Sequence, residues 1–313
     1  MSKTPQLGIF NEEATHFYFL EYHLNSKNSV QVKQVIAGVL NTCKKQCPAV
    51  SIVVSFGETA WHFLQPNWMP STLKSFKTLH GEKGHQALST QADLFFWVHG
   101  IDISQVFDIA LTIDRQLKSI AHLALQERGF SYHQNLDLIG FEDGTANPET
   151  DELKLEAAVI AEGLPGAGGC LVLSQKWLHD LEKWNDIPIH CQEAVVGRTK
   201  LENIELEGEA MPSDSHISRT DLKVDEVAMK IYRRSAPFGS VTEKGLFFLA
   251  FGCELLRFTT QLESMYGLTE DHTIDQLLNF SKAVTGSYWF APSQEDLEAL
   301  LVVPESLSEK EHV

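Results

Sequence analysis

Three short polar segments of the sequence carry residue types that can move protons or hold a metal. The first, residues 140–148 (GFEDGTANP), places Asp143 between two glycines near the middle of the chain. Glycines permit positive φ or a close backbone approach, and Asn147-Pro148 forces an extended or turn exit, so the segment predicts an acid held in a tight turn. An Asx-turn in an ordinary surface loop is the alternative. A calcium loop is disfavoured because the acids lack EF-hand spacing.

The second and third segments contribute a histidine and an arginine. His216 stands in the polar stretch 215–219 (SHISR), where it is either a metal ligand or a solvated residue. Arg233 continues one alternating face of a strand predicted over 227–232, directly before 235–239 (SAPFG). An arginine in that position can face a pocket, although arginines at strand ends commonly reach solvent. The sequence contains no zinc spacing, Walker loop, dinucleotide-binding fingerprint or nucleophile elbow.

Most of the thirteen histidines are interpreted as surface or structural residues. Three of them fall on patterns that we interpret as helical, where packing or solvation explains them more simply than ligation: His62, His122 and His179.

Composition describes a globular chain and limits its partners. Of 313 residues, 43% are hydrophobic and 21% are charged, which allows a sizeable core. Acidic residues outnumber basic ones 42 to 25, and the formal charge of -17 disfavours nucleic acid and anionic membranes as partners. No run of about 18 apolar residues and no signal-like N-terminus occurs, so we expect a cytoplasmic protein. Five cysteines favour reduced thiols over a disulfide framework.

Hydrophobic patterns predict a mixture of strands and helices. Strands are expected over 17–24, 49–56 and 94–99, and helices follow them before Pro48, over 58–64 and over 106–120. The strand–glycine–helix unit beginning at Leu94 is echoed 152 residues later at Leu246, and a looser echo links 52–64 with 171–181. We interpret these echoes as duplication of an α+β unit, although chance similarity is the alternative. Polar, acidic residues over 201–226 predict an exposed connection.

The three segments, in their order and spacing, resemble the signatures of the dye-decolorizing peroxidase family. The resemblance covers most of the chain, including residues 5–9, 166–169 and 245–248, and is closest to the compact bacterial cytoplasmic members. It implies an α+β fold of duplicated ferredoxin-like units, with antiparallel sheets and helices of the dimeric α/β barrel type. The expected division is an N-terminal half over 1–149, a haem-binding C-terminal half over 150–305 and a polar tail over 306–313.

The resemblance also implies a role for individual residues. One haem b per chain is expected, with His216 as the proximal axial ligand of its iron. Asp143 becomes the distal acid–base residue, Arg233 the distal cation, and Ser235, where some relatives have Asn, a residue that orders distal water. The expected activity is a peroxidase that uses hydrogen peroxide to oxidise aromatic or dye-like substrates by one-electron steps.

Two further expectations concern the surroundings of these residues. Gly144 and Thr145 should contact the cofactor beside Asp143. Asp275 is the candidate to accept a hydrogen bond from the proximal imidazole and make it more basic, while capping of a helix over 276–280 is the equal alternative. Since Arg233 would lower the pKa of Asp143 and burial would raise it, we expect an activity optimum on the acidic side.

Other functions fit parts of the same pattern. The pocket could bind and deliver haem or another porphyrin with incidental peroxidase activity, or the segments could be coincidental in a non-haem interaction protein. Expected partners are hydrogen peroxide, small aromatic reductants and further copies of the chain in a dimer or larger homo-oligomer. The polar tail is either disordered or an address for a partner.

Overall fold

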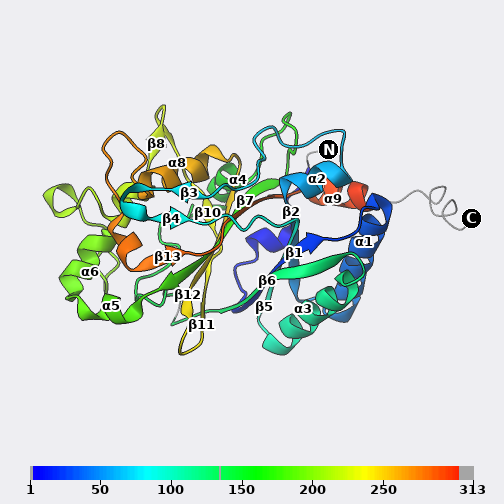
Figure 1. The fold of residues 1–313 in the computed structure, drawn as a ribbon, viewed down its shortest axis with the longest axis horizontal. Helices are drawn as coiled ribbons and strands as arrows, with labels where there is room; N and C mark the ends of the chain where they lie inside the picture. Colours follow the sequence, from blue (N-terminus) through cyan, green and yellow to red (C-terminus); the bar gives the residue numbers. More distant parts are fainter. Residues whose placement is uncertain (1–2, 134, 303–313) are drawn as a thin grey trace, which may run out of the picture.

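A closed ring of strands forms the centre of the molecule (Figure 1). The computed structural model describes residues 3–133 and 135–302. Within those residues eight strands complete the ring, and every pairing is antiparallel. In order they are β12 (Lys244–Gly252), β11 (Ala236–Gly239), β6 (Ala121–Phe130), β1 (His16–Leu24), β5 (Leu94–Gly100), β2 (Ser51–Phe56), β14 (Ser287–Ala291) and β7 (Cys170–His179). Pairing of β7 with β12 closes the ring. β10 (Tyr232–Arg233) pairs with β12 next to β11, and β13 (Ser281–Ala283) pairs with β7 next to β14, each further along the same strand edge.

The ring consists of two four-stranded sheets that touch at two seams. One sheet comes from residues before 131 and the other from residues after 169. At one seam Gly129 of β6 pairs with Phe238 of β11, and at the other Phe56 pairs with Phe290. A Cβ at Gly129 would lie 2.7 Å from the Cβ of Ala236, so only glycine allows the two strands to approach this closely.

Helices cover the outer faces of both sheets. On the first sheet, α3 (Ile103–Leu117) packs against β1 and β5, and α1 (Ser29–Gln46) packs against α3. On the second, α4 (Asp151–Ala158) packs against β12, and α8 (Leu256–Met265) packs against α7 (His216–Thr220). The remaining helices are α2 (Glu58–Leu64), α5 (Leu181–Asp186), α6 (Ile189–Val196) and α9 (Gln294–Leu301). Short elements complete the connections: η1 (Leu7–Phe10), β3 (Leu79–His80), η2 (Glu82–Gly84), β4 (Gln86–Ala87), η3 (Gly208–Ala210), β8 (Lys223–Val224), β9 (Val227–Ala228) and η4 (Gln276–Asn279).

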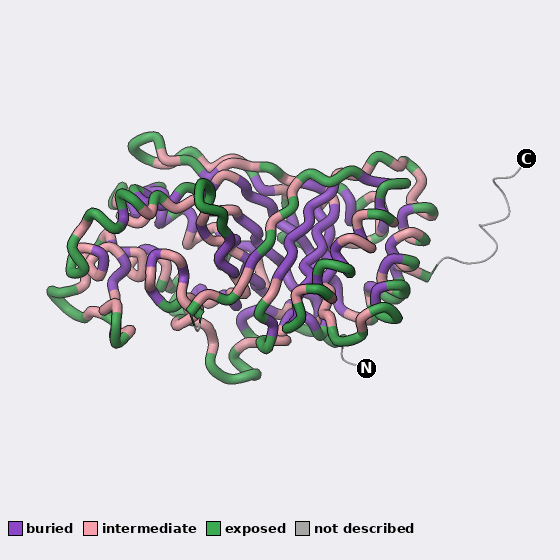
Figure 2. Tube along the Cα trace, turned by 90° about the horizontal axis from the view of Figure 1, so that it is seen from below, coloured by how far each residue is buried: buried purple, intermediate pink, exposed green. Residues whose placement is uncertain are grey.

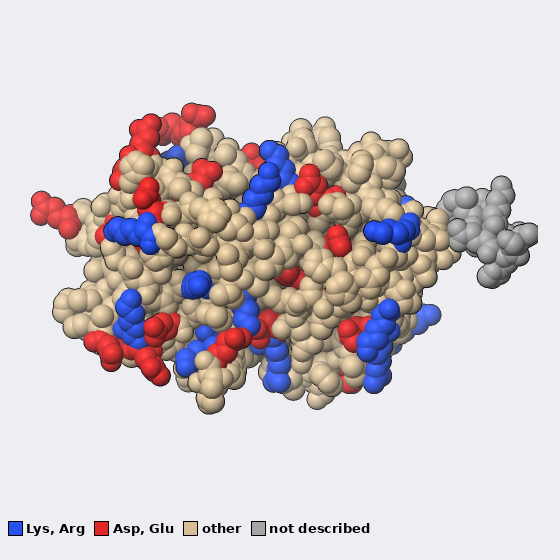
Figure 3. Space-filling view, viewed as in Figure 1, with Lys and Arg blue, Asp and Glu red and all other residues tan. Residues whose placement is uncertain are grey.

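Alternation along the strands divides the core into two layers. In β1, Phe17 and Phe19 point into the ring, whereas Tyr18 and Leu20 point out towards the helices. The interior is packed with aromatic rings, and Phe19 stacks on Phe247 with centroids 4.0 Å apart. Buried residues accordingly concentrate in the central strands, while exposed residues lie around the periphery (Figure 2). On one face, acidic side chains gather at the end that holds α5, α6 and β8 (Figure 3).

The structure confirms the mixed helix and antiparallel-sheet fold that the sequence predicts. The helix over 58–64 is observed with those bounds, and the strands expected at 17–24, 49–56 and 94–99 appear as β1, β2 and β5. The tail predicted over 306–313 lies outside the described residues. Among the helices that the structure describes, none combines the length and apolarity that a membrane crossing requires.

Four local predictions are wrong. Two concern histidines interpreted as helical, since His122 lies in strand β6 and His179 ends strand β7; the other two concern the segments of Arg233 and His216. The strand expected over 227–232 is interrupted, because β8 and β9 form a separate hairpin whose turn has positive φ at Asp225 (48°) and Glu226 (64°). Val227 therefore does not share a buried face with Arg233 and is 52% exposed. The loop expected around His216 instead contains helix α7, which His216 begins and Ser215 caps by accepting the Ser218 N–H at 3.3 Å.

The ring interior also contains one buried carboxyl group, that of Glu21. It is 1% exposed and accepts a hydrogen bond from Ser174 Oγ at 2.9 Å, and Ser174 in turn accepts one from the Trp289 indole at 2.9 Å. Burial raises the pKa of Glu21 from 4.5 to about 7. The native state thus binds this proton more tightly than the unfolded chain. The resulting stability is fully present below pH 4.5 and is lost as pH rises through about 7.

We predict that Glu21→Gln removes this pH dependence. The wild type should lose roughly 2 to 3 kcal/mol of unfolding free energy between about pH 5 and pH 8 through this group, and the variant should not. Urea unfolding at both pH values measures the difference. The exposed Glu13→Gln is the matched control and should behave as the wild type. Equal pH dependence in Glu21→Gln and wild type would contradict the prediction.

Candidate functional site

The candidate site is a cavity of about 680 Å³ in the C-terminal half of the molecule. Its wall includes residues of the loop between β6 and α4, of β7 and β12, and of helices α7 and α8. Much of the lining is apolar: Leu173, Trp177, Ile217, Met229, Ile231, Leu246, Phe248, Phe258, Leu262, Met265, Leu277 and Leu278. Asp143, His216 and Arg233, from the three segments singled out in the sequence, line this one cavity. A cavity whose wall combines apolar side chains with polar groups is typical of a ligand site.

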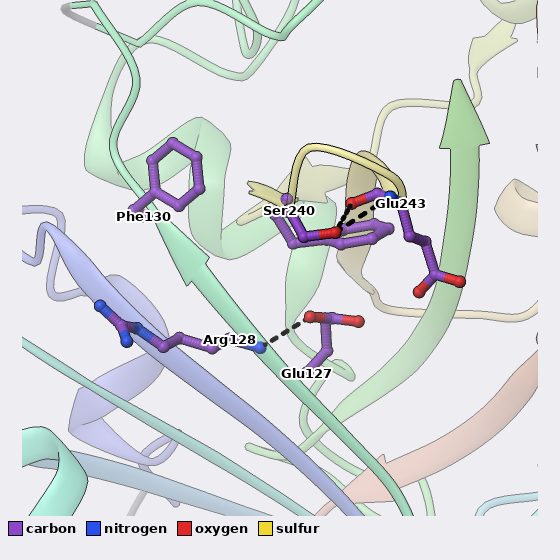
Figure 4. Close-up of a pocket in the computed structure, with 7 residues that line it drawn as sticks. Glu127, Arg128, Phe130, Ser240 and Glu243 are labelled. Carbon is purple, nitrogen blue, oxygen red and sulfur yellow. Dashed lines mark hydrogen bonds between the residues drawn. The ribbon is translucent and has the colours of Figure 1, made fainter. Parts of the chain in front are cut away.

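A smaller cavity of about 360 Å³ lies where β6 and β11 meet (Figure 4). Its two carboxylates, Glu127 and Glu243, both contact Lys176 Nζ, at 2.7 and 2.6 Å. Ser240 lies in the turn beside Glu243 and accepts its backbone N–H at 3.0 Å. Because its carboxylates already share a cation, this cavity is the weaker candidate for chemistry.

His216 is oriented by a buried carboxylate. Its Nδ1 lies 2.6 Å from Oδ2 of Asp275, whose side chain is fully buried. The other oxygen of Asp275 accepts the Leu277 N–H at 2.8 Å and thereby caps η4. The two alternatives for Asp275 in the sequence analysis therefore occur together, one on each oxygen. With Nδ1 bound to Asp275, Nε2 is the ring nitrogen available to a metal.

Helix α7 is held in place by a second residue of its segment, Arg219. Its guanidinium contacts Asp271 at 2.7 Å and Ser264 of α8 at 2.9 Å. Arg219 is buried in these contacts and anchors the short helix that carries His216.

Asp143 and Arg233 come from two different segments of the chain, and their side chains lie close together in the cavity wall. Arg233 Nη1 lies 3.7 Å from Asp143 Oδ1, with side chains 22% and 17% exposed. Asn147 holds the two segments together, because its Nδ2 donates to the Arg233 carbonyl and its Oδ1 accepts the Arg233 N–H, both at 2.9 Å. Positive φ at Gly140 (86°) and Gly144 (89°) allows the tight turn that the sequence predicts.

The surroundings of Asp143 affect its pKa in opposite directions. Burial is the main cause of a raised pKa, and the nearby Asp137 carboxylate raises it further. The Arg233 guanidinium lowers the pKa of Asp143 but only partly offsets burial. The net direction is upward, so Asp143 gains a proton more readily than an ordinary aspartate.

Of the remaining predicted site residues, one lines the cavity and two do not. Thr145 lines the cavity, and its hydroxyl accepts a hydrogen bond from Asn203 Nδ2 at 2.8 Å. Gly144 forms the turn behind Asp143 and is not among the lining residues of the described chain. Ser235 also lies outside that lining, and its hydroxyl accepts the Leu249 N–H at 3.3 Å.

Two residues of the cavity were missed or misplaced in the sequence analysis. Asn147 was noted only as the residue before a proline, and its bridge to Arg233, 86 residues away, has no local signal. His179 was placed on a helical pattern, but it ends strand β7 and lines the cavity. Its pairing with Asp137 and Ser281 depends on contacts far apart in sequence.

The ligand set limits which metal groups this cavity can hold. Across residues 3–133 and 135–302, no group of three or more His, Cys, Asp or Glu side chains could hold a bare metal ion. A metal bound by His216 must therefore bring most of its ligands with it, as the iron of a porphyrin does. The apolar lining around His216 suits such a macrocycle.

Both halves of the chain match models of one protein family. Residues 6–131 match the family model described as Dyp-type peroxidase, N-terminal, and residues 134–296 match Dyp-type peroxidase, C-terminal. A dye-decolorizing peroxidase of Rhodococcus erythropolis is 32% identical over 289 residues, covering 90% of this chain and 84% of the relative. One from Mycobacterium tuberculosis is 34% identical over 253 residues, covering 80% and 75%.

Solved structures show the same architecture. A Dyp-type peroxidase protein from Shewanella oneidensis superposes with a TM-score of 0.90 at 32% identity, covering 97% of this chain and all of that one. A variant of Rhodococcus jostii DypB in complex with heme superposes with a TM-score of 0.88 at 31% identity, covering 95% and 99%.

We predict that Arg233→Leu raises the pKa of Asp143 further. Loss of the guanidinium removes the opposite charge that partly offsets burial, so the Asp143 carboxyl should titrate at a higher pH than in the wild type. Carbon-13 NMR of labelled aspartate measures the titration. Arg198→Leu is the matched control, since Arg198 lines the cavity but pairs with Glu205 at 2.8 Å. An unchanged Asp143 titration in Arg233→Leu would contradict the contact.

Proposed function

The chain belongs to the dye-decolorizing peroxidase family and is a haem peroxidase, and we propose that it uses hydrogen peroxide to oxidise aromatic or dye-like substrates by one-electron steps. Haem b is its cofactor. The observation that carries the proposal is the arrangement of His216–Asp275 and Asp143–Arg233 around one apolar cavity. The first pair suits an axial metal ligand, and the second suits proton transfer beside a developing charge.

We assign the cofactor contacts as follows. His216 Nε2 would bind the iron, and Asp275, which holds the imidazole at Nδ1, would make it more basic. The apolar side chains of the cavity would pack on the macrocycle, and Thr145 and Arg233 of the lining, with Gly144 in the turn beside Asp143, would contact it. When bound, haem would supply the redox chemistry for the reduction of peroxide and the one-electron oxidation of the reductant.

The acid–base work belongs to the chain itself. Asp143, in its ionised form, accepts a proton from hydrogen peroxide and returns it to the departing oxygen as water forms. Arg233 stabilises the negative charge that develops during cleavage of the peroxide bond. Ser235 orders water on this side of the site in our proposal, although its hydroxyl also accepts the Leu249 N–H.

This role for Asp143 fixes the sign of the pH dependence. Only the carboxylate can accept the first proton, so activity falls as pH drops through the Asp143 pKa. Burial raises that pKa, which moves the acid limb upward, while Arg233 limits the displacement. We propose that peroxidase activity has its pH optimum on the acidic side.

The two sheets are in our proposal duplicated ferredoxin-like units, with halves at 1–149 and 150–305. Strand order supports this interpretation. The first sheet is ordered β6-β1-β5-β2 and the second β14-β7-β12-β11, so both have the order fourth, first, third, second. The cytoplasmic location and the homo-oligomeric state stay predictions from the sequence.

We predict that Asp143→Asn and His216→Ala fail in different ways. Asp143→Asn should bind haem normally but react with peroxide about 10² to 10⁴ times more slowly, which is the usual contribution of general acid–base catalysis. His216→Ala should lose the absorbance band of histidine-ligated haem. Stopped-flow and equilibrium absorbance of the reconstituted protein measure both effects.

Asp221→Asn is the matched control, because Asp221 lines the cavity but pairs with Lys230 at 2.7 Å. It should retain the wild-type rate. Full turnover by Asp143→Asn at every pH would contradict the mechanism. Rapid transfer of haem to an acceptor protein without peroxide turnover would contradict the peroxidase proposal itself.

A further inference from the structure

A second chain of hydrogen-bonding side chains lines the main cavity. His179 lies between Ser281 of β13 and Asp137 of the loop after β6. Its Nδ1 is 2.8 Å from Ser281 Oγ, and its Nε2 is 3.1 and 3.3 Å from the two Asp137 oxygens. All three residues line the cavity and are buried or nearly so, with the His179 side chain 5% exposed. We propose that His179 is a proton relay residue, which exchanges protons with the cavity through Ser281 and acts on Asp143 through Asp137.

The backbone fixes all three residues without help from a ligand. Ser281 and His179 are direct partners in the pairing of β13 with β7, which brings their side chains together. Asp137 is held by a turn, in which its N–H donates to the Phe141 carbonyl and its own carbonyl accepts the Gly140 N–H, both at 2.8 Å. The chain is therefore preorganised, as a relay requires.

The hydrogen-bond partners assign a direction to proton movement. An ionised Asp137 only accepts, so Nε2 of His179 carries a hydrogen, and the neutral ring accepts the Ser281 hydroxyl at Nδ1. A proton from the cavity binds to the Ser281 oxygen and forms a new O–H bond. At the same time the original O–H bond of Ser281 breaks, and its proton moves to Nδ1 of His179. The cationic ring then donates from both nitrogens. Protons are conserved, and no heavy atom has to move.

Asp137 links this relay to Asp143. The two acids line the same cavity from paired arms of one loop, in which Leu136 pairs with Glu142 and the Asp143 N–H donates to the Asn135 carbonyl at 2.9 Å. The negative charge of Asp137 accordingly raises the pKa of Asp143. A proton gained by His179 offsets the charge of Asp137 and so favours the ionised form of Asp143. The relay thus helps to keep Asp143 able to accept a proton.

An unpartnered donor on the same strand face supports proton traffic here. Gln175, Trp177 and His179 alternate along β7 and all line the cavity. Gln175 is 1% exposed, and within the described part of the chain its Nε2 has no hydrogen-bond partner. A buried amide N–H in a cavity wall favours a polar occupant, such as water, beside His179.

Other charged groups near His179 are engaged elsewhere. Asp180 caps α5 by accepting the Lys183 N–H at 3.0 Å, and Lys183 Nζ donates to the Asn279 carbonyl at 3.0 Å. Lys282 follows Ser281 but points to the exposed face of β13. Among the described residues, Asp137 is thus the charged group that contacts the ring.

The same residue types form the nucleophilic triad of serine hydrolases. In a nucleophile elbow the serine is exposed on a sharp turn, where a substrate carbonyl can reach it. Ser281 is instead buried within a strand and paired directly with its histidine. This geometry favours proton exchange over acyl transfer.

The test compares Ser281→Ala with Ser281→Thr, which restores the hydroxyl. If the relay acts, Ser281→Ala lowers kcat/KM for peroxide about tenfold on the acid limb of the pH profile. This effect is at the low end for acid–base catalysis, because Ser281 acts on the reaction through His179 and Asp137. Ser281→Thr should recover most of the loss, and KM for the reductant should not change. A drop in thermal stability of Ser281→Ala without a change in the pH profile would overturn the proposal.

Because the relay rests on the proposed peroxidase function, a second experiment tests it without any peroxide reaction. Protein loaded with diamagnetic zinc protoporphyrin is titrated by nitrogen-15 NMR of His179, in wild type and in Asp143→Asn. The His179 titration midpoint should shift between the two, and that of Asp143 should shift in His179→Gln. Equal midpoints would overturn the relay. Shifted midpoints in a protein that cannot turn over peroxide would keep the relay and reject the peroxidase.

Discussion

The pairing of Asp143 with Arg233 depends on the two hydrogen bonds between Asn147 and the backbone of Arg233. β10 lies on the same edge of β12 as β11, and within the described residues no further strand pairs with it, so its N–H and C=O groups that face away from β12 need a partner. The Asn147 amide supplies both hydrogen bonds at 2.9 Å and takes the place of a neighbouring strand. It thereby ties the loop after the first sheet to the second sheet. The 3.7 Å approach of Asp143 to Arg233 follows from this tie.

The position of His216 follows from the same physical rule, that a buried polar group must be satisfied. Asp275 is fully buried and divides its oxygens between the η4 N-terminus and His216. One carboxylate therefore fixes both a local turn and the direction of an imidazole 59 residues away. The cavity wall also carries many apolar side chains, and their low polarity strengthens the electrostatic interactions of the charged groups beside them.

Sequence reasoning succeeded where the determining contacts are local. The tight turn around Asp143 could be predicted because glycines with positive φ define it, and the main helices and strands because their periodicity defines them. It failed for His179, whose role depends on strand register with Ser281, 102 residues away. The strand expected over 227–232 failed because residues with positive φ turned the chain into a hairpin. The alternation of apolar residues could not reveal that turn.

The claim that Asn147 positions the distal pair is tested most directly by the peroxide reaction of haem-loaded Asn147→Ala. Stopped-flow absorbance follows the rate, and the haem band before mixing reports cofactor binding. Our account predicts retained haem and a rate about 10² to 10³ times lower, because the displaced Arg233 no longer stabilises the developing charge. A wild-type rate in Asn147→Ala with retained haem would contradict it.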